Sequence, residues 1–173
     1  DTIITENKID NSSINQIITE NSVEFLQTLA KYHFEHSHIN SIGITGSNGK
    51  TILKEWLYQC LSNEFVTVKS PKSFNSQIGL PLSILQIDKK HELGIFEVGI
   101  SKPDEMEKQE NVFHPKIGLL THIGTAHSAN FSSEEELINE KLKLFKQSEI
   151  IFFNSDNELT GNLINQLYSS KKL

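Results

Sequence analysis

The sequence has only one cysteine, no excess of basic residues and no apolar run of membrane-spanning length. A single thiol, Cys60, excludes a disulfide within the chain and fits a reducing compartment. The formal net charge of −6 offers no basic face to a nucleic acid, so a polyanionic polymer is not an expected partner. No signal peptide is recognisable, and we expect a cytoplasmic protein without membrane contacts.

The sequence also lacks the side-chain patterns of enzymes that form a covalent intermediate. No Ser/His/Asp or Cys/His arrangement points to an enzyme nucleophile, so a covalent enzyme intermediate is not expected. Internal repeats and low-complexity tracts are absent as well. The acidic balance means that any charge used to bind an anion has to be supplied locally, by a few lysines, helix N–H groups or a divalent cation.

What the sequence does contain is an alternation of strand-like and helix-like segments along its 173 residues. Strands are expected at 42–45, 64–68, 93–98, 116–123 and 149–153. Helices are expected at 22–36, from 51, at 103–111, at 132–147 and from about 158. This alternation predicts an α/β fold with a mainly parallel sheet and flanking helices. Residues 1–20 are polar without a clear period, which is typical of a linker or of the frayed end of a preceding domain.

A glycine-rich loop follows the first of these strands and runs directly into a helix. Backbone N–H groups of such a loop and helix start face an anion, while Lys50 reaches the terminal phosphates and the Thr51 hydroxyl is placed to bind Mg²⁺. The glycines at 43, 46 and 49 depart from the strict Walker spacing, so the alternative is a turn that binds nothing. The predicted nucleotide-binding residues are Thr45, Gly46, Ser47, Asn48, Gly49, Lys50 and Thr51.

Two further polar residues follow later strands at the same predicted edge of the sheet. Glu97 ends one strand and His127 lies in the loop after the next. Because ligands of open α/β sheets bind at the carboxyl ends of the strands, Glu97 and His127 are expected near Thr51, where the three side chains offer ligands to Mg²⁺. The alternatives are that Glu97 pairs with a lysine and that His127 bonds to backbone.

Helical periodicity predicts which side chains turn inward. An apolar stripe on the helix after the loop predicts packing on the sheet, with Cys60 buried, through Leu53, Trp56, Leu57, Cys60 and Leu61. In the helix at 132–147, Lys141 shares a face with Leu137 and Leu144, whereas Lys143 points outward. An inward lysine loses its charge or finds a carboxylate, and Glu140 and Glu97 are candidate partners.

Five segments in the same order resemble the Mur ligases, the ATP-dependent amide ligases of peptidoglycan precursor synthesis. They are 43–51, 72–81, 96–99, 123–127 and 140–145, within a match over about 22–160. The resemblance implies the P-loop NTPase-like central domain of this family, present in part over 41–173. Residues 1–40 then correspond to a remnant of the preceding domain and a linker helix.

The resemblance also implies roles for single residues. Asn75 joins the nucleotide-binding set, Lys50, His127 and Lys141 act in catalysis, and ATP and Mg²⁺ are the cofactors. The implied metal ligands are Thr51, Glu97, His127 and Lys141. In several Mur ligases the matching lysine is carbamylated by CO₂, which makes it an anionic oxygen ligand; the alternative for Lys141 is a plain ammonium paired with Glu140 or Glu97.

The reaction that the resemblance implies is the addition of D-alanyl-D-alanine to UDP-N-acetylmuramoyl-tripeptide through an acyl phosphate. The segments 50–57 and 99–106 are most similar to a form fused to an alanine racemase. Open alternatives are another ligase of the superfamily, such as a folylpolyglutamate synthase, and a P-loop kinase or GTPase. A further alternative is a monomeric fragment that binds nucleotide and catalyses nothing by itself.

Overall fold

A five-stranded parallel sheet forms the centre of the computed structural model, which describes residues 2–10, 13–124 and 130–169. The strand order is β4-β5-β3-β6-β7, so the first strand of the sheet lies in its middle. From there the chain goes to the edge strand β4, returns to β5 beside the centre, and then continues through β6 to the other edge at β7. The strands are β3 (Asn40–Thr45), β4 (Thr67–Lys69), β5 (Leu93–Glu97), β6 (Ile117–Leu120) and β7 (Ile150–Phe152). The predicted α/β fold with a parallel sheet is confirmed.

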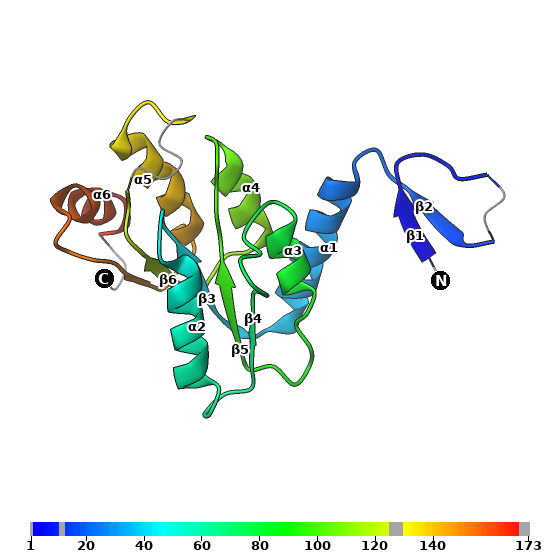
Figure 1. Cartoon of the computed structure of the whole chain (residues 1–173), viewed down its shortest axis with the longest axis horizontal. Helices are drawn as coiled ribbons and strands as arrows, with labels where there is room; N and C mark the ends of the chain where they lie inside the picture. The colour runs from blue at the N-terminus through cyan, green and yellow to red at the C-terminus, as the bar shows by residue number, and fades with distance from the viewer. Residues whose placement is uncertain (1, 11–12, 125–129, 170–173) are drawn as a thin grey trace.

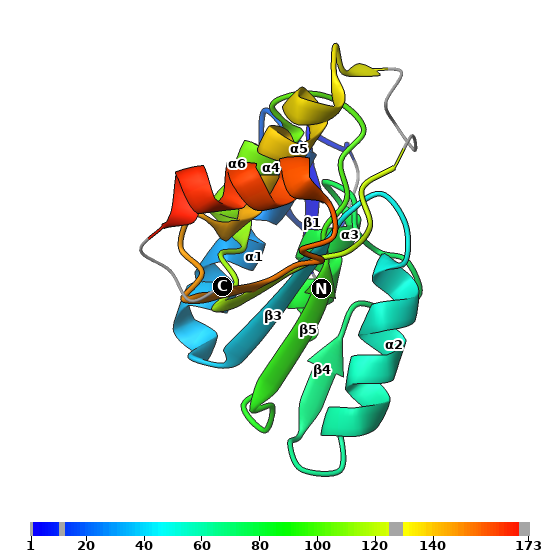
Figure 2. The ribbon, with the colours of Figure 1, turned by 90° about the vertical axis from the view of Figure 1, so that its left-hand side faces the viewer.

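Helices cover both faces of this sheet (Figures 1 and 2). Helix α2 packs on one face, and the other helices pack on the opposite face. The helical elements are α1 (Ser22–Ser37), α2 (Lys50–Leu61), α3 (Gly79–Ile84), α4 (Glu105–Val112), α5 (Glu134–Leu142), the 3-10 turn η2 (Lys143–Phe145) and α6 (Glu158–Tyr168). No helix in the described residues is long and apolar enough to cross a lipid bilayer.

Two of the predicted helix starts have the capping geometry that their sequences indicate. The side-chain oxygen of Asn21 accepts from the backbone N–H groups of Val23 and Glu24 at the start of α1. The hydroxyl of Ser133 accepts from the N–H of Glu136 at 3.1 Å at the start of α5. Such bonds satisfy donors that have no partner in the first helical turn, and they fix where the helix begins.

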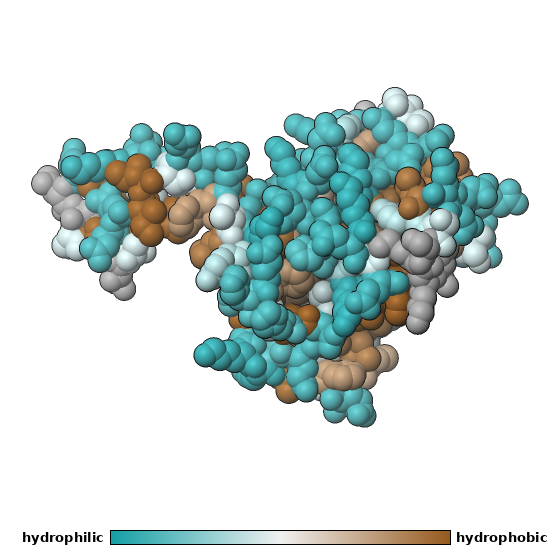
Figure 3. Space-filling model, turned by 180° about the vertical axis from the view of Figure 1, so that it is seen from behind, coloured by the Kyte–Doolittle hydropathy of each residue, from teal (hydrophilic) through white to brown (hydrophobic). Residues whose placement is uncertain are grey.

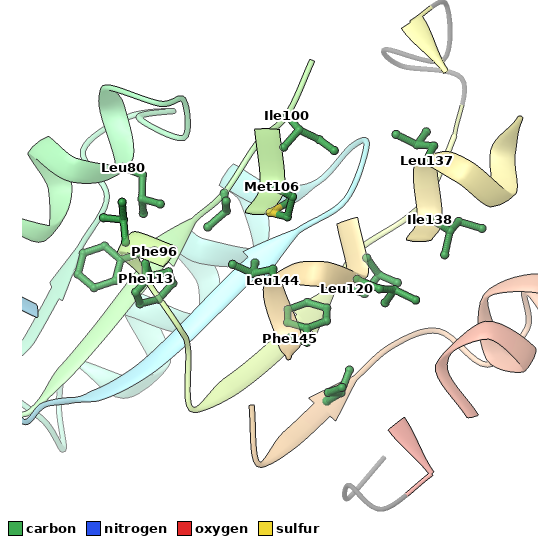
Figure 4. Close-up of a cluster of buried hydrophobic side chains, with 14 of the residues drawn as sticks. Leu80, Phe96, Ile100, Met106, Phe113, Leu120, Leu137, Ile138, Leu144 and Phe145 are labelled. Atoms are coloured by element: carbon green, nitrogen blue, oxygen red, sulfur yellow. The ribbon is translucent and has the colours of Figure 1, made fainter. Parts of the chain in front are cut away.

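Strand β5 shows how the sheet sorts its side chains. Successive residues of a strand point to opposite faces, so Leu93, Ile95 and Glu97 share one face. Leu93 and Ile95 pack in the cluster under α2. Phe96 points to the other face and meets Phe113 edge-to-face, with ring centroids 5.3 Å apart (Figure 4). The same alternation therefore directs the Glu97 carboxylate toward α2.

The larger hydrophobic cluster lies on the face opposite α2 and holds the C-terminal half of the fold together (Figure 4). Phe145 is fully buried in it and packs directly over Gly118 of β6. Leu137, Leu144 and Phe145 are buried as the helical period predicted. This packing anchors α5 and η2, and with them Lys141.

The N-terminal residues contain two strands that the sequence did not predict. Strands β1 (Thr2–Thr5) and β2 (Asn15–Ile18) pair in parallel and form a small unit that projects from the body beyond α1 (Figure 1). The Gln16 side chain closes the connection by bonding to the N–H and carbonyl of Ile9 at 2.8 Å. Apolar side chains remain exposed on this unit (Figure 3). The pairing was missed because it depends on contacts between segments, which local periodicity does not report.

The apolar stripe predicted for α2 is rotated in the structure. Trp56 is 63% exposed and Cys60 is exposed as well, so the prediction that these two residues face the sheet is wrong. Leu53, Leu57 and Leu61 do pack against the cluster under α2. The difference arises because the residue at the centre of the buried face is a lysine, Lys54, which the periodicity analysis assigned to no face.

Candidate nucleotide-binding site

The loop between β3 and α2 needs two glycines for different reasons. Gly46 has a φ of +143°, and a Cβ there would lie 2.0 Å from the hydroxyl oxygen of Thr121. Gly49 has a φ of +83°, and nothing lies within 4 Å of the position that its Cβ would take. A side chain is therefore disfavoured by contact at Gly46 and by backbone conformation at Gly49. The open space at Gly49 is on the side from which α2 begins.

The start of α2 has no side-chain cap. Backbone N–H groups of Ser47 and Asn48 donate to the carbonyl of His122 at 2.9 and 3.4 Å, and the Ser47 hydroxyl donates to the Gly124 carbonyl. The expectation that the loop N–H groups face an anion therefore does not hold for residues 47 and 48, whose N–H groups are bonded to His122. The N–H groups of residues 49–51 have no partner among the described residues, and free N–H groups at an uncapped helix start are suited to an anion.

Lys50 lies over this loop. Its ammonium donates to the carbonyls of Gly46 and Ser47 at 2.7 and 3.3 Å. Burial lowers the pKa of Lys50, and the negative charge of Glu97 opposes that shift. The side chain lines a cavity of about 330 Å³ together with Asn75, Gly99 and neighbouring residues. A cation at the mouth of an uncapped helix start is an arrangement suited to binding phosphate.

Asn75 reaches the cavity from the loop after β4. Its carbonyl accepts from the Gly99 N–H at 2.8 Å. Its side chain covers Gly99, where a Cβ would lie 2.9 Å from the Asn75 side-chain oxygen. The structure thus brings Asn75 and Lys50 to one cavity, as expected of two nucleotide-binding residues. The Thr45 hydroxyl is buried without a hydrogen-bond partner, at the point where β3 enters the loop.

Glu97 and Thr51 meet on the face of the sheet that α2 covers, close to each other as predicted. The Thr51 hydroxyl donates to Oε2 of Glu97 at 2.9 Å, and the carboxylate is fully buried. Oε1 of the same carboxylate lies 3.1 Å from the ammonium of Lys54, which the sequence analysis did not identify. The alternative that Glu97 pairs with a lysine is therefore confirmed together with its predicted contact to Thr51.

Lys141 turns inward, as its helical position predicted. It is fully buried, and its ammonium donates to the Gly46 carbonyl at 3.3 Å. Burial, with a smaller contribution from the nearby positive charge of Lys50, lowers the pKa of Lys141 to about 8. Lys143 points outward and pairs with Glu140 at 2.7 Å. Among the described residues no carboxylate pairs with Lys141, so the structure does not show the alternative of an ammonium paired with Glu140 or Glu97.

The donor atoms at this edge are suited to a hard cation. The described residues contain no group of three or more His, Cys, Asp and Glu side chains that would enclose a metal by itself. Mg²⁺ commonly takes few protein ligands and completes its shell with phosphate oxygens and water. The adjacent oxygens of Thr51 and Glu97 fit that mode of binding. His127, the predicted nitrogen ligand, lies outside the described residues.

The sheet, the loop and the start of α2 define a nucleotide-binding α/β domain of the phosphate-loop class. Residues 44–172 match the family model of the Mur ligase middle domain. The chain belongs to the Mur ligase family.

Relatives of known name agree with this assignment. The UDP-N-acetylmuramoyl-tripeptide–D-alanyl-D-alanine ligase of Borreliella burgdorferi is 39% identical over 150 residues, covering 86% of this chain and 32% of the relative. The ligase of the same name from Bacillus subtilis is 30% identical, over 84% of this chain and 33% of the relative. The chain thus spans about a third of the length of these relatives.

Among solved structures, MurF ligase from Thermotoga maritima, in complex with ADP, superposes with a TM-score of 0.86. It is 31% identical, and the match covers 96% of this chain and 39% of that one. The fold described above therefore matches a segment of that ligase.

Proposed function

We propose that this chain is the ATP-binding part of a ligase that joins D-alanyl-D-alanine to UDP-N-acetylmuramoyl-tripeptide. The observation that carries the proposal is the bond between the Thr51 hydroxyl and the buried Glu97 carboxylate, 2.9 Å apart, beside an uncapped helix start with Lys50 over it. The names of the relatives support the choice of substrates.

Each residue of the site has a distinct task in this proposal. ATP phosphorylates the terminal carboxylate of the tripeptide, and the amine of the dipeptide then attacks the acyl phosphate. Such phosphoryl transfer depends on positioning and on charge stabilisation. Lys50 and the N–H groups of residues 49–51 hold the phosphates, while Thr51 and Glu97 supply oxygens to the Mg²⁺ ion that offsets phosphate charge. Asn75 contacts the nucleotide from the far side of the cavity.

The rival functions have less support. A GTPase reads guanine with an Asn-Lys-x-Asp motif, and residues 7–10 have that sequence. These residues connect β1 to β2 in the projecting N-terminal unit, far from the phosphate loop (Figure 1). Another ligase of the superfamily is less favoured, since the relatives reported above share one name. A fused alanine racemase stays a prediction.

The test is the substitution Lys50→Ala in the intact enzyme. Loss of the positioned cation is expected to lower phosphate release, measured with both substrates present, by about 10²–10³-fold, because a group that stabilises charge in the transition state is removed. The matched control is Lys116→Ala, which removes an exposed lysine paired with Glu149 at 4.0 Å. Phosphate release by Lys50→Ala at the rate of the unmodified enzyme would refute the proposal.

A further inference from the structure

Lys54 is a buried cation for which the proposed function has no task. It lies one turn after Lys50 in α2, and its side chain is fully buried. Lysine is almost never fully buried unless it is paired, because removing an ammonium from water is costly. The 16 residues that count as lysine or arginine are all lysines, so no arginine contributes positive charge at this site.

The Lys54 ammonium has three polar partners, two of them hydrogen-bonded and one an ion-pair contact. It lies 3.1 Å from Oε1 of Glu97 and 3.3 Å from Oε1 of Glu55, and it donates to the backbone carbonyl of Lys72. An ammonium has three donors and no acceptor; Lys72 and Glu97 use two of them, and the Glu55 carboxylate lies 3.3 Å from the nitrogen. Lys54 is thus fully buried among protein partners and, unlike Lys50, does not line the cavity beside the phosphate loop.

The consequence for Glu97 is that both carboxylate oxygens are fixed. Lys54 holds Oε1, and the Thr51 hydroxyl donates to Oε2 at 2.9 Å. A carboxylate accepts about four hydrogen bonds, so lone pairs remain for a further ligand while rotation about the last side-chain bond is restrained. Without Lys54, the buried anion would be free to turn and to repel phosphate oxygens at the loop.

Lys54 also ties a third segment to this carboxylate. Lys72 has a left-handed backbone with a φ of +49°, a conformation that a residue other than glycine rarely adopts. Its carbonyl is one of the three polar partners of the Lys54 ammonium. The same loop continues to Asn75, which lines the cavity next to Lys50. One buried ammonium therefore connects the phosphate-loop helix, the end of β5 and the loop that carries Asn75.

We propose that Lys54 is a positioning residue: it sets the orientation of the Glu97 carboxylate toward the divalent cation that accompanies the nucleotide. This inference rests on the proposed function. Lys54 acts through Glu97 and does not touch substrate, so its removal weakens metal binding only as long as Glu97 is present to be positioned.

The experiment uses the intact ligase and measures binding of Mn²⁺ in the presence of ADP, from the electron paramagnetic resonance signal of the free ion. Lys54→Met is expected to weaken Mn²⁺ binding at least tenfold. The matched control is Lys69→Met, since Lys69 also pairs with Glu55 but lies over the ring of Tyr58, 4.0 Å from its centroid. The Mn²⁺ affinity of this control is expected to stay within twofold of that of the unmodified enzyme.

A double-mutant cycle separates positioning from a general loss of structure. Glu97→Gln leaves the ion held by the nucleotide, and adding Lys54→Met to it is expected to change Mn²⁺ binding less than twofold. Unchanged binding in Lys54→Met alone, or an undiminished tenfold loss in the Glu97→Gln background, would overturn the proposal. If Lys54 only supported the fold, its replacement would weaken Mn²⁺ binding tenfold in the Glu97→Gln background as well.

A second variant covers the case in which Lys54→Met does not fold. Lys54→Gln keeps an N–H donor for Glu97 without the charge, and its Mn²⁺ affinity is expected to be at least threefold weaker than that of the unmodified enzyme. An unchanged affinity would again overturn the proposal. Failure of the proposed function has a different signature, since Lys50→Ala would then retain full turnover whatever the metal affinity of the Lys54 variants.

Discussion

Lys54 and Lys141 are both fully buried near the phosphate loop, and they differ in how their charge is accommodated. Lys54 has a carboxylate at 3.1 Å. Lys141 has a backbone carbonyl at 3.3 Å and the repulsion of Lys50 nearby. A buried ammonium without a counter-ion is destabilised relative to its neutral amine, which is why the pKa of Lys141 falls to about 8. The neutral amine is the form that reacts with electrophiles.

The first prediction at this scale concerns stability and pH. The pKa of Lys141 falls from 10.5 to about 8 on folding, so between these values the unfolded chain binds more protons and stability rises with pH. The penalty, on the order of 3 kcal/mol, is fully present below pH 8 and vanishes above 10.5. Lys141→Met removes it, so the advantage of this variant in unfolding free energy is expected to shrink across that window. Denaturant titrations in CO₂-free buffer measure it, and a constant difference would contradict the pKa shift.

The second prediction is that Lys141 of the intact enzyme is carbamylated. The ammonium first loses one proton, and the neutral amine then attacks CO₂. As the C–N bond forms, one C=O π bond opens to give the carboxylate and the nitrogen releases a second proton to solvent, so the side chain becomes an anionic oxygen ligand. Nuclear magnetic resonance with isotopically labelled bicarbonate is expected to show one carbamate signal that Lys141→Ala lacks. Lys141→Ala is expected to lose activity, with partial rescue by a short-chain carboxylate and none by bicarbonate. A bare Lys141 ammonium in a full-length structure with nucleotide and Mg²⁺ would refute this prediction.

At the scale of the elements, close packing between helix and sheet decides where the site residues lie. Phe145 of η2 covers β6 at Gly118, and a Cβ on Gly118 would lie 2.5 Å from the Phe145 ring. Gly161 lies within α6, and the nearest atom to its Cβ position is 3.8 Å away. The same substitution therefore has opposite consequences at these two glycines, because a Cβ at Gly118 would overlap a packed ring, whereas a Cβ at Gly161 would make an ordinary van der Waals contact.

The third prediction is that alanine substitution changes the free energy of unfolding in opposite directions at Gly118 and Gly161. Gly118→Ala is expected to destabilise the chain by about 1–3 kcal/mol, since a core that is already packed has to shift. Gly161→Ala is expected to stabilise it by about 0.5–1 kcal/mol, because alanine loses less entropy than glycine in a helix. Chemical denaturation of the two variants measures both values. A neutral effect of Gly118→Ala would show that η2 packs less closely on β6 than described.

For the whole molecule, the relevant fact is that the chain covers only 32–39% of its named relatives and of the ADP-bound neighbour. The phosphate loop, Glu97 and Lys141 are held by one sheet and its helices, so these parts of the site are complete within the chain. Binding of a nucleotide has to offset the loss of freedom of the ligand, and few contacts to its phosphates are insufficient for high affinity.

The fourth prediction follows for the chain of 173 residues by itself. It is expected to show no ligase activity and weak or undetectable ATP binding in isothermal titration calorimetry. The folded state of the sample is checked by the cooperative unfolding of the same preparation, so that an absence of binding is not confused with an absence of structure. Tight ATP binding together with steady turnover would contradict the expectation.

Much of the fold was predictable because its signals are local. The alternation of strands and helices, the caps at Asn21 and Ser133, and the order of strand, glycine loop and Lys50-Thr51 all depend on residues within a few positions of one another. The inward direction of Lys141 followed from its spacing to Leu137 and Leu144. These local patterns determined the fold class and most residues of the candidate site.

Only the tertiary structure decided the partners of the charged groups and the orientation of α2. Lys54 and Glu97 are 43 positions apart in the sequence and come into contact only in the folded chain. Helical periodicity predicts which side chains of a helix share a face, but it gives no information about a distant carboxylate that pairs with a buried lysine. The same contact turns Trp56 and Cys60 outward. The pairing of β1 with β2 is likewise a contact between separate segments. Local patterns establish where helices and strands form. The free energy of burying a charge depends instead on which residues, distant in the sequence, pair with it.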